Sequence, residues 1–349
     1  MKKTNLTAAV LTQLGKKLEI VSDIKIEALS EHQVIVKILY TGICHSQIME
    51  IDGLRGDDPW LPHCLGHEAV ATVVEVGEKV KKVEVGDTVV VGWIVGEGCA
   101  GATPHLHSDT IGKINAGHCT TFSTYSVISE NRLVPLPDGF PIELGALFGC
   151  AFPTGCGIVL NEVRPTASEK VLVVGLGGIG MSAVLTLKAL DVKNVVCVDI
   201  DHEKLNLIRD LTGYEIHNSG EQDKDKLLED LNLKFGKFDC SLDAAGFTDT
   251  IELAFEALRK DGRCVFASHP SYGEKIKLDP FDLINGKTIR GSWGGGSNPD
   301  QIIPELAILF SDMLPTLEKL VSRYRGIDTI NDAIDDFRNK NIIRAIVEI

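Results

Sequence analysis

Three residues in the first half of the chain are of the types that hold a catalytic metal ion. They are Cys44 in the segment G-I-C-H-S, His67 in G-H-E and Cys150 in F-G-C-A. Thiolate sulfur and imidazole nitrogen are good ligands for zinc, and a catalytic zinc takes three protein ligands and leaves the fourth position for water or substrate. The three residues together predict one catalytic zinc site.

A glycine-rich turn follows the third ligand. The segment V-L-V-V-G-L-G-G-I-G is an apolar strand that runs into Gly175, Gly177, Gly178 and Gly180. The pattern G-x-G-x-x-G allows a tight turn and a close backbone approach, so a pyrophosphate can sit at the N-terminus of the next helix. We therefore predict a dinucleotide site; a glycine turn in a non-binding sheet is the alternative.

An acidic residue ends the next predicted strand and indicates which dinucleotide binds. A carboxylate at Asp199 would accept hydrogen bonds from the ribose hydroxyls and repel a 2′-phosphate. Asp201 adds a second negative charge, and no arginine follows within the next few residues. We predict NAD rather than NADP as the cofactor, with Lys204 as a further contact to it.

Composition excludes several classes of partner. The 349 residues include 44% hydrophobic and 24% charged residues, with a formal net charge of -14. The negative charge argues against nucleic-acid and anionic-membrane surfaces. No apolar run reaches the roughly 18 residues of a membrane helix, and the nine cysteines show no disulfide-framework spacing. A cytoplasmic location is expected, without nucleic-acid or membrane partners.

Strand and helix patterns divide the chain. The β-branched runs at 34–40, 71–77 and 85–91 predict a β-rich N-terminal domain. From residue 171 the pattern alternates between strands and helices, which predicts a parallel, doubly wound α/β sheet. The predicted elements of this region lie at 171–174, 178–190, 195–198, 239–242, 248–258 and 264–267.

The last part of the chain is predicted to return to the first domain. This prediction rests on a helix at 299–310 and a final strand at 344–349. We expect a catalytic domain made of residues 1–151 and 297–349, and a cofactor domain made of residues 152–296.

The sequence resembles the zinc-dependent alcohol dehydrogenases of the medium-chain dehydrogenase/reductase superfamily over nearly its whole length. The resemblance implies a GroES-like β-barrel catalytic domain plus a Rossmann domain, with the active site in the cleft between them. It also implies a small alcohol or aldehyde substrate and a homodimer or homotetramer. The motifs that carry it are G-I-C-H-S, L-P-x-x-L-G-H-E (Leu61–Glu68), V-G-D-T-V (Val85–Val89), C-A-F-P-T-G (Cys150–Gly155), the glycine turn and I-R-A-I-V (Ile343–Val347).

The same resemblance implies roles for single residues. Cys44, His67 and Cys150 would ligate the zinc, which acts as a Lewis acid and lowers the pKa of the alcohol. Ser46 would take the alcohol proton while hydride passes to the nicotinamide.

Further roles follow from the same resemblance. Thr154 would face the nicotinamide, and His45 would meet the cofactor phosphates. Glu68 and Arg344 would form a pair close to the metal, and Arg344 would also reach the pyrophosphate.

Two residues near the first ligand depart from the family pattern. Gln47 stands where these enzymes usually carry an aspartate that accepts a hydrogen bond from the zinc-bound histidine. We expect the amide oxygen of Gln47 to orient His67, with a smaller gain in ligand basicity. Met49 stands where some members carry a relay histidine, so the proton must leave through water, the cofactor ribose or another base, for which His45 and His269 are the candidates.

The lobe that holds a structural zinc in many members also departs from the pattern. The corresponding segment, 98–119, keeps Cys99 from the usual cysteine triplet. We expect this segment to bind no structural zinc. A rebuilt site from Cys99, His105, His107 and His118 is the alternative.

Four residues are predicted to line the substrate pocket. Trp93 and Phe122 match positions that line the substrate channel by the zinc, and Trp293 lies where the sheet edge reaches the nicotinamide. His269 follows a predicted strand and is a polar handle or relay base. The alternative for the tryptophans is packing at a domain boundary.

Other functions compete with this one. A zinc-free quinone or enone reductase would lack the three ligands, and polyol or sugar dehydrogenases often carry glutamate where this chain has Cys150. A biosynthetic aldehyde reductase, or a nucleotide-binding protein without catalysis, stays open, although Ser46 and Thr154 favour an enzyme. The sequence leaves the identity of the alcohol and the direction of the reaction open.

Overall fold

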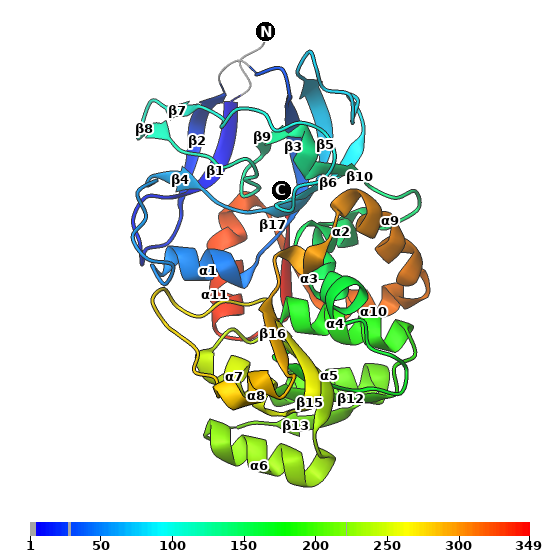
Figure 1. Cartoon of the computed structure of the whole chain (residues 1–349). Coiled ribbons are helices and arrows are strands. Elements are labelled where there is room, and N and C mark those ends of the chain that lie inside the picture. The colour runs from blue at the N-terminus through cyan, green and yellow to red at the C-terminus, as the bar shows by residue number, and fades with distance from the viewer. Residues whose placement is uncertain (1–4, 27–28, 221) are drawn as a thin grey trace. The chain divides into compact units, whose positions relative to one another are not determined.

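The computed structural model describes residues 5–26, 29–220 and 222–349. Contacts along the chain divide it into two compact units (Figure 1). Unit 1 consists of Met1–Cys150 and Asn298–Ile349, and unit 2 consists of Ala151–Ser297.

Unit 1 contains two sheets. The first has five strands in the order β4-β1-β2-β7-β8, and the second has seven, in the order β10-β6-β5-β3-β18-β17 with β9 paired to β3. The strands of the first sheet are β1 (Asn5–Leu11), β2 (Glu19–Ile26), β4 (His63–Cys64), β7 (Leu106–Ser108) and β8 (Gly112–Ile114). Those of the second are β3 (Gln33–Gly42), β5 (Glu68–Val76), β6 (Thr88–Gly92), β9 (Tyr125–Ser129), β10 (Leu133–Pro135), β17 (Val321–Arg325) and β18 (Arg344–Glu348).

The predicted N-terminal strands correspond to β3, β5 and β6, because alternate β-branched residues of these strands bury one face. Val34, Val36, Ile38, Ala69 and Val89 are fully buried in a shared core cluster. The final strand β18 pairs antiparallel with β3 and parallel with β17. The last strand of the chain therefore joins the sheet that contains β3.

Helices of unit 1 flank these sheets. The α-helices are α1 (His45–Ile51), α2 (Ile142–Gly145), α9 (Pro299–Leu309), α10 (Leu314–Glu318) and α11 (Ile330–Arg338). The short 3-10 helices are η1 (Glu130–Arg132), η2 (Ala146–Gly149), η5 (Ser311–Met313) and η6 (Ile327–Thr329). α9 begins with Pro299 after Asn298, whose side chain accepts a hydrogen bond from the backbone N–H of Asp300, as expected for a helix N-terminus.

Unit 2 is built on one sheet of six parallel strands in the order β13-β12-β11-β14-β15-β16. This is the strand order of a doubly wound nucleotide-binding sheet. The order of successive strands changes from one side of β11 to the other, where β14 lies parallel to it. The strands are β11 (Lys170–Val174), β12 (Asn194–Asp199), β13 (Glu215–Asn218), β14 (Phe238–Asp243), β15 (Leu258–Phe266) and β16 (Thr288–Gly291). The prediction of a parallel doubly wound sheet is confirmed.

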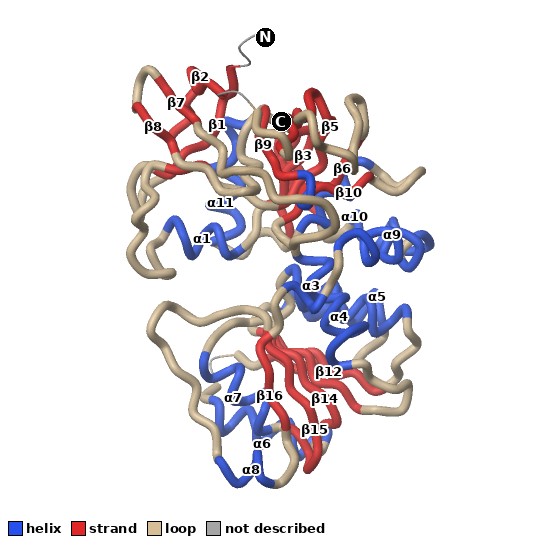
Figure 2. Tube along the Cα trace, turned by 45° about the horizontal axis from the view of Figure 1, so that its top comes forward, coloured by secondary structure: helices blue, strands red, loops and turns tan. Residues whose placement is uncertain are grey.

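Helices cover both faces of this sheet, with α4 and α5 on one side and α6, α7 and α8 on the other (Figure 2). The leucines of α6 and α7 pack on the apolar residues of β11 and β12 in one core cluster. The helices of unit 2 are α3 (Ala151–Gly157), the π-helix η3 (Ile158–Val163), α4 (Gly178–Ala189), α5 (His202–Thr212), α6 (Lys224–Phe235), α7 (Thr248–Glu256), α8 (Pro280–Ile284) and η4 (Gly294–Gly296).

Within the described part of the chain, no single helix is long and apolar enough to cross a membrane. One bent pair, Ile142–Gly149 followed by Ala151–Val163, reaches the required length and composition only when both helices are taken together.

Candidate metal and nucleotide sites

The three predicted ligands meet in unit 1. Cys44 is the residue before α1, His67 directly precedes β5, and Cys150 directly follows η2. Their ligand atoms all lie within 4.8 Å of one another. His67 Nε2 is 3.2 Å from Cys150 Sγ, which is 3.9 Å from Cys44 Sγ. Two sulfurs and one imidazole nitrogen at these separations fit a tetrahedral zinc with one open position.

The two thiols of this group are linked by a hydrogen bond. The hydrogen bond from Cys150 lowers the pKa of the Cys44 thiol well below its ordinary value. The same hydrogen bond raises the pKa of Cys150 well above its ordinary value. Because a metal ion binds cysteine as the thiolate, a divalent cation at this group would release thiol protons.

Trp93 contacts the third ligand. Its indole Nε1–H donates to Cys150 Sγ at 3.2 Å. A donor at this position would stabilise a thiolate and hold its direction. The structure thus gives Trp93, predicted as a wall of the substrate pocket, a contact to a ligand as well.

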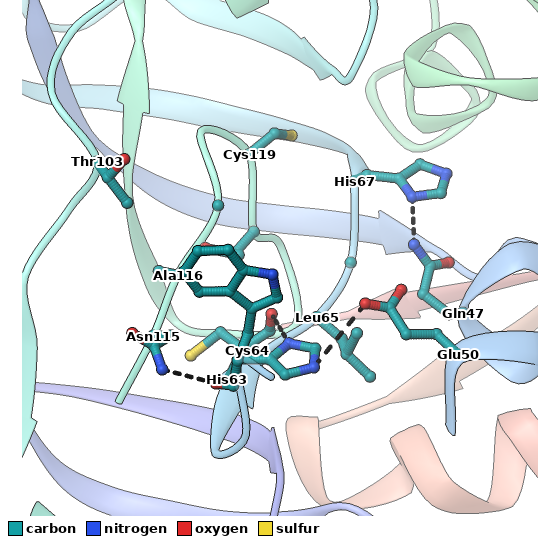
Figure 3. A pocket seen from close by; sticks show the side chains of 14 residues that line it. Gln47, Glu50, His63, Cys64, Leu65, His67, Thr103, Asn115, Ala116 and Cys119 are labelled. Carbon is teal, nitrogen blue, oxygen red and sulfur yellow. Dashed lines mark hydrogen bonds and ion pairs between the residues drawn. The ribbon is translucent and has the colours of Figure 1, made fainter. Parts of the chain in front are cut away.

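Gln47 contacts His67, but with the amide nitrogen and not with the oxygen that we expected. The oxygen Oε1 accepts the backbone N–H of Cys44 at 3.0 Å and so caps α1. The amide nitrogen Nε2 therefore faces His67 Nδ1 (Figure 3). The expectation was wrong because the amide oxygen, the acceptor of Gln47, already accepts the backbone N–H of Cys44 at the start of the helix.

Glu68 and Arg344 form the predicted pair. Both side chains are buried, with exposed fractions of 0% and 2%, and Arg344 Nη2 donates to Glu68 Oε1. Burial raises the pKa of Glu68, and the facing guanidinium opposes that shift. Glu68 Oε2 and Arg344 Nε are buried without a hydrogen-bond partner among the described residues. Removal of either partner from a charged pair so deeply buried would leave the other charge uncompensated and destabilise the fold.

The two residues after Cys44 lie in the first turn of α1. Ser46 is partly buried, and His45 is exposed, with its ring 6.4 Å from that of Phe337. The role of the Ser46 hydroxyl as proton acceptor stays a prediction.

A cavity of about 380 Å³ lies beside His67 in unit 1. The polar side chains of Gln47, Glu50, His63 and Asn115 contribute to its walls (Figure 3). The remaining lining residues are Trp60, Cys64, Leu65, Gly66, His67, Thr103, Ala116, Gly117, Cys119 and Thr120.

The residues predicted to line the substrate pocket are not among those around this cavity. Phe122 is fully buried in a core cluster with Ile43 and Leu65, so its side chain packs in the core of unit 1. His269 and Trp293 belong to unit 2 and lie after β15 and β16, and both are exposed. Their assignment to a substrate pocket stays a prediction.

The glycine turn has the shape that a dinucleotide requires. A Cβ at Gly175, whose φ is +89°, would lie 2.5 Å from Ala245 N, and a Cβ at Gly180 would lie 1.8 Å from Gly175 O. A Cβ at Gly177 would meet nothing within 4 Å. Two glycines therefore serve close packing, and the third leaves open space at the N-terminus of α4, where no side chain caps the helix. Gly178 is the first residue of that helix.

Asp199 lies beside this turn. Its Oδ2 accepts the backbone N–H of Leu176 at 2.5 Å, and its Oδ1 accepts that of Asp201 at 2.9 Å. Asp201 in turn caps α5 by accepting the N–H groups of Glu203 and Lys204. The sequence pattern thus places a carboxylate at the turn, at the carboxyl end of β12.

Thr154 also belongs to unit 2. It lies in α3 with an exposed fraction of 4%. A Cβ at Gly295 would lie 2.4 Å from the Thr154 carbonyl oxygen, so α3 and η4 pack closely here.

The segment 98–119 contains the short hairpin β7–β8, which pairs with β2 and was not predicted. Among the described residues, the group within metal-binding distance that includes Cys99 is formed with His32 and Glu130. His105, His107 and His118 belong to no such group in that part of the chain. The alternative site that uses these histidines is therefore not supported.

A third group, Glu50, Asp58 and His63, was missed in the sequence. Its members come from α1, the following loop and β4. The available signal was the pair of acidic residues Asp57–Asp58 shortly before P-H-C, which by itself is typical of any exposed loop.

Comparison with known proteins agrees with this arrangement. The model of the alcohol dehydrogenase GroES-like domain matches residues 30–138, and that of the zinc-binding dehydrogenase domain matches residues 178–311. The chain belongs to the zinc-type alcohol dehydrogenases of the medium-chain superfamily. The predicted fold class, a GroES-like domain plus a Rossmann sheet, is confirmed.

Individual relatives span the whole chain. S-(hydroxymethyl)glutathione dehydrogenase of Escherichia coli is 29% identical, with 97% of this chain and 98% of the relative covered. Benzyl alcohol dehydrogenase of Acinetobacter calcoaceticus has a solved structure with a TM-score of 0.86 at 27% identity, covering 99% of each chain. An alcohol dehydrogenase zinc-binding domain protein from Burkholderia ambifaria gives a TM-score of 0.89 at 27% identity over 100% of each chain. An oxidoreductase of the alcohol dehydrogenase kind follows from these likenesses.

Proposed function

We propose that the protein transfers hydride between a small alcohol, or its aldehyde or ketone, and NAD(H), with one catalytic zinc held by Cys44, His67 and Cys150. The observation that carries this proposal is the convergence of the three ligand atoms within 4.8 Å. A bound zinc would supply a Lewis acid that makes the alcohol proton easier to remove. An enzyme in the cytoplasm that forms a homodimer or homotetramer fits the resemblance.

The remaining steps belong to the residues of the chain. Ser46 lies in the first turn of α1, and by the family resemblance its hydroxyl would accept the alcohol proton. Trp93 would hold the Cys150 thiolate by its N–H. Glu68 directly follows His67 in the sequence and forms a buried ion pair with Arg344, which would support the position of the ligand.

Unit 2 would hold the cofactor. The open space at Gly177 and the uncapped N-terminus of α4 suit a pyrophosphate. The Asp199 carboxylate suits the ribose hydroxyls and disfavours a 2′-phosphate. We assign Lys204, Thr154, His45 and Arg344 to further cofactor contacts on the basis of the family resemblance; the unpartnered Nε of Arg344 leaves a donor available for one.

The test joins metal analysis with an absorbance assay. Purified protein should hold one tightly bound zinc per chain after dialysis, and should form NADH from NAD and simple aliphatic or benzylic alcohols. Cys44→Ala should lose both zinc and turnover while NAD still binds, since the glycine turn belongs to the other unit. Cys156→Ala, a buried thiol of unit 2, serves as the matched control. Turnover by a zinc-free Cys44→Ala variant would refute the proposal.

A further inference from the structure

A second cluster of ligating side chains lies on the wall of the cavity beside His67. Glu50 lies in the last turn of α1, Asp58 lies in the loop that follows, and His63 begins β4. One ligand atom from each lies within 4.8 Å of the others. Glu50 and His63 line the cavity (Figure 3). None of the three residues belongs to the Cys44, His67 and Cys150 group.

The imidazole of His63 is held in a fixed direction. Its Nδ1 donates to the backbone carbonyl of Cys64 at 3.1 Å. Its Nε2 faces Asp58 Oδ2 at 2.8 Å and Glu50 Oε1 at 3.8 Å. The ring is about nine-tenths buried, with 9% of its side chain exposed. Because metal-bound histidines commonly donate their other ring N–H to a carbonyl or carboxylate, this arrangement leaves Nε2 as the ligand atom.

With Nδ1–H donating to Cys64, a positive species between Nε2 and the two carboxylates would be favourable. A lone pair on Nε2 that faces two carboxylates would be repulsive at these distances, and little water reaches the ring to screen it. Asp58 has a fixed orientation as well, because its Oδ1 accepts the backbone N–H of Trp60 at 2.9 Å. Its Oδ2 is therefore directed at the same point as His63 Nε2.

The separations suit a small divalent cation after a slight expansion. Ligands at about 2.1 Å from one ion, at angles between octahedral and tetrahedral, lie about 3.0–3.4 Å apart. The observed distances from His63 Nε2 are 2.8 Å and 3.8 Å, so shifts of a few tenths of an ångström seat the ion. The cavity gives room for water on its remaining coordination positions.

We propose that Glu50, Asp58 and His63 bind an exchangeable divalent cation of the first transition row, in addition to the catalytic zinc. One imidazole and two carboxylates suit manganese, iron or zinc, and they do not provide the thiolates that make a zinc site very tight. An imidazolium ion pair without metal is the competing occupant, and the experiment separates the two.

The group of His32, Cys99 and Glu130 is a poorer site and gives a matched control. Glu130 is already saturated, because it accepts from the backbone N–H groups of Cys99 and Lys81 and contacts the His32 ring. Lys79 and Lys82 also line the space around this group, and their positive charge opposes a cation.

The test titrates Mn²⁺ into the zinc-loaded full-length protein and follows free Mn²⁺ by its electron paramagnetic resonance signal. We expect one saturable site per chain. His63→Gln and Asp58→Asn should each weaken it by about tenfold or more, whereas His32→Gln should leave it unchanged. Both of the first two variants are close in size to the natural residue, so a failure of one to fold leaves the other informative.

The location can be read from Trp60, which lines the same cavity. Bound Mn²⁺ is paramagnetic and should quench the Trp60 fluorescence, and Trp60→Phe should remove the quenching but keep the Mn²⁺ affinity. No saturable Mn²⁺ binding, or equal binding by wild type, His63→Gln and Asp58→Asn, would leave the ion pair as the occupant and overturn the proposal. Zinc content and alcohol turnover are measured on the same samples, so a failure of the proposed catalytic function shows separately.

Discussion

Gln47 offers the sharpest test of how the metal group is held. Its amide nitrogen faces His67 Nδ1 because its oxygen caps the first turn of α1 at Cys44. A histidine that binds a metal through Nε2 carries its proton on Nδ1, so two donors would face each other. We expect Gln47→Glu to tighten zinc binding, since one carboxylate oxygen can keep the cap while the other accepts from Nδ1–H.

The size of the effect follows from the burial of this contact. Gln47 has an exposed fraction of 2%, so water does not screen the new hydrogen bond. Partners of this kind change metal affinity by about 10–100-fold, which is roughly 1.4–2.7 kcal/mol. The new charge is unfavourable without metal, so Gln47→Glu should make the metal-free protein less stable. The gap in unfolding temperature between zinc-loaded and zinc-free protein should therefore widen.

The assay is competition for zinc against a chromophoric chelator of known affinity. Gln47→Leu, which removes both the cap and the histidine contact, should bind zinc more weakly than wild type. Gln33→Glu is the matched control, because Gln33 is a similarly buried glutamine of the same unit, with an exposed fraction of 4%, whose hydrogen bonds go to Ser30 and Ala102. It adds the same buried charge without contact to a ligand and should leave zinc affinity unchanged.

The order of affinities decides the matter. The reasoning predicts that Gln47→Glu binds most tightly, wild type and Gln33→Glu are equal, and Gln47→Leu binds most weakly. A Gln47→Glu affinity within about threefold of wild type would show that the amide reorients at no cost when metal binds, and an affinity below wild type would refute the expected gain from the carboxylate.

Three further predictions concern other parts of the chain. Asp199→Gly combined with Ile200→Arg, at a position that is 51% exposed, should shift kcat/KM from NAD toward NADP without removing the Asp201 cap of α5; a higher wild-type kcat/KM with NADP would contradict the assignment. Arg344→Met should destabilise unit 1 by about 3–5 kcal/mol in urea unfolding because it leaves the Glu68 carboxylate buried and unpaired, and adding Glu68→Leu should recover part of that loss. Burial raises the pKa of Asp243 to about 6 from 3.8, so stability is lost as pH rises through about 6; Asp243→Asn should then stabilise unit 2 by up to about 3 kcal/mol at pH 8 and by little at pH 4, and an equal effect at both pH values would exclude this cause.

Regular elements of the chain could be predicted from the sequence because their signals are local. The run Val171–Val174 became β11, and the helix expected at 178–190 became α4 (Gly178–Ala189). The final strand predicted at 344–349 became β18 (Arg344–Glu348). Apolar periodicity and glycine turns depend only on neighbouring residues. The short hairpin β7–β8 escaped because its strands have three residues each, too few for a period to show.

Contacts within the site join residues that are distant in the sequence, so local patterns do not predict them. The grouping of Cys44, His67 and Cys150 was predictable because its residues carry the family resemblance, and the resemblance encodes their meeting in space. The orientation of Gln47 was not predictable from the sequence. It depends on which of two donors, the Cys44 N–H or the His67 ring N–H, forms the hydrogen bond to the amide oxygen.

The cluster at His63 lies beyond both kinds of signal. Glu50 and His63 are brought together by the turn after α1 and by the pairing of β4 with β1, and no periodic pattern predicts that distance. The resemblance gives no role to Glu50 or Asp58, so nothing pointed to them before the fold was known. The fold places His63 Nε2 at 2.8 Å from Asp58 Oδ2 and at 3.8 Å from Glu50 Oε1. A group that neither local pattern nor resemblance predicts is where a property particular to this chain would reside, and Mn²⁺ titration of His63→Gln tests for one.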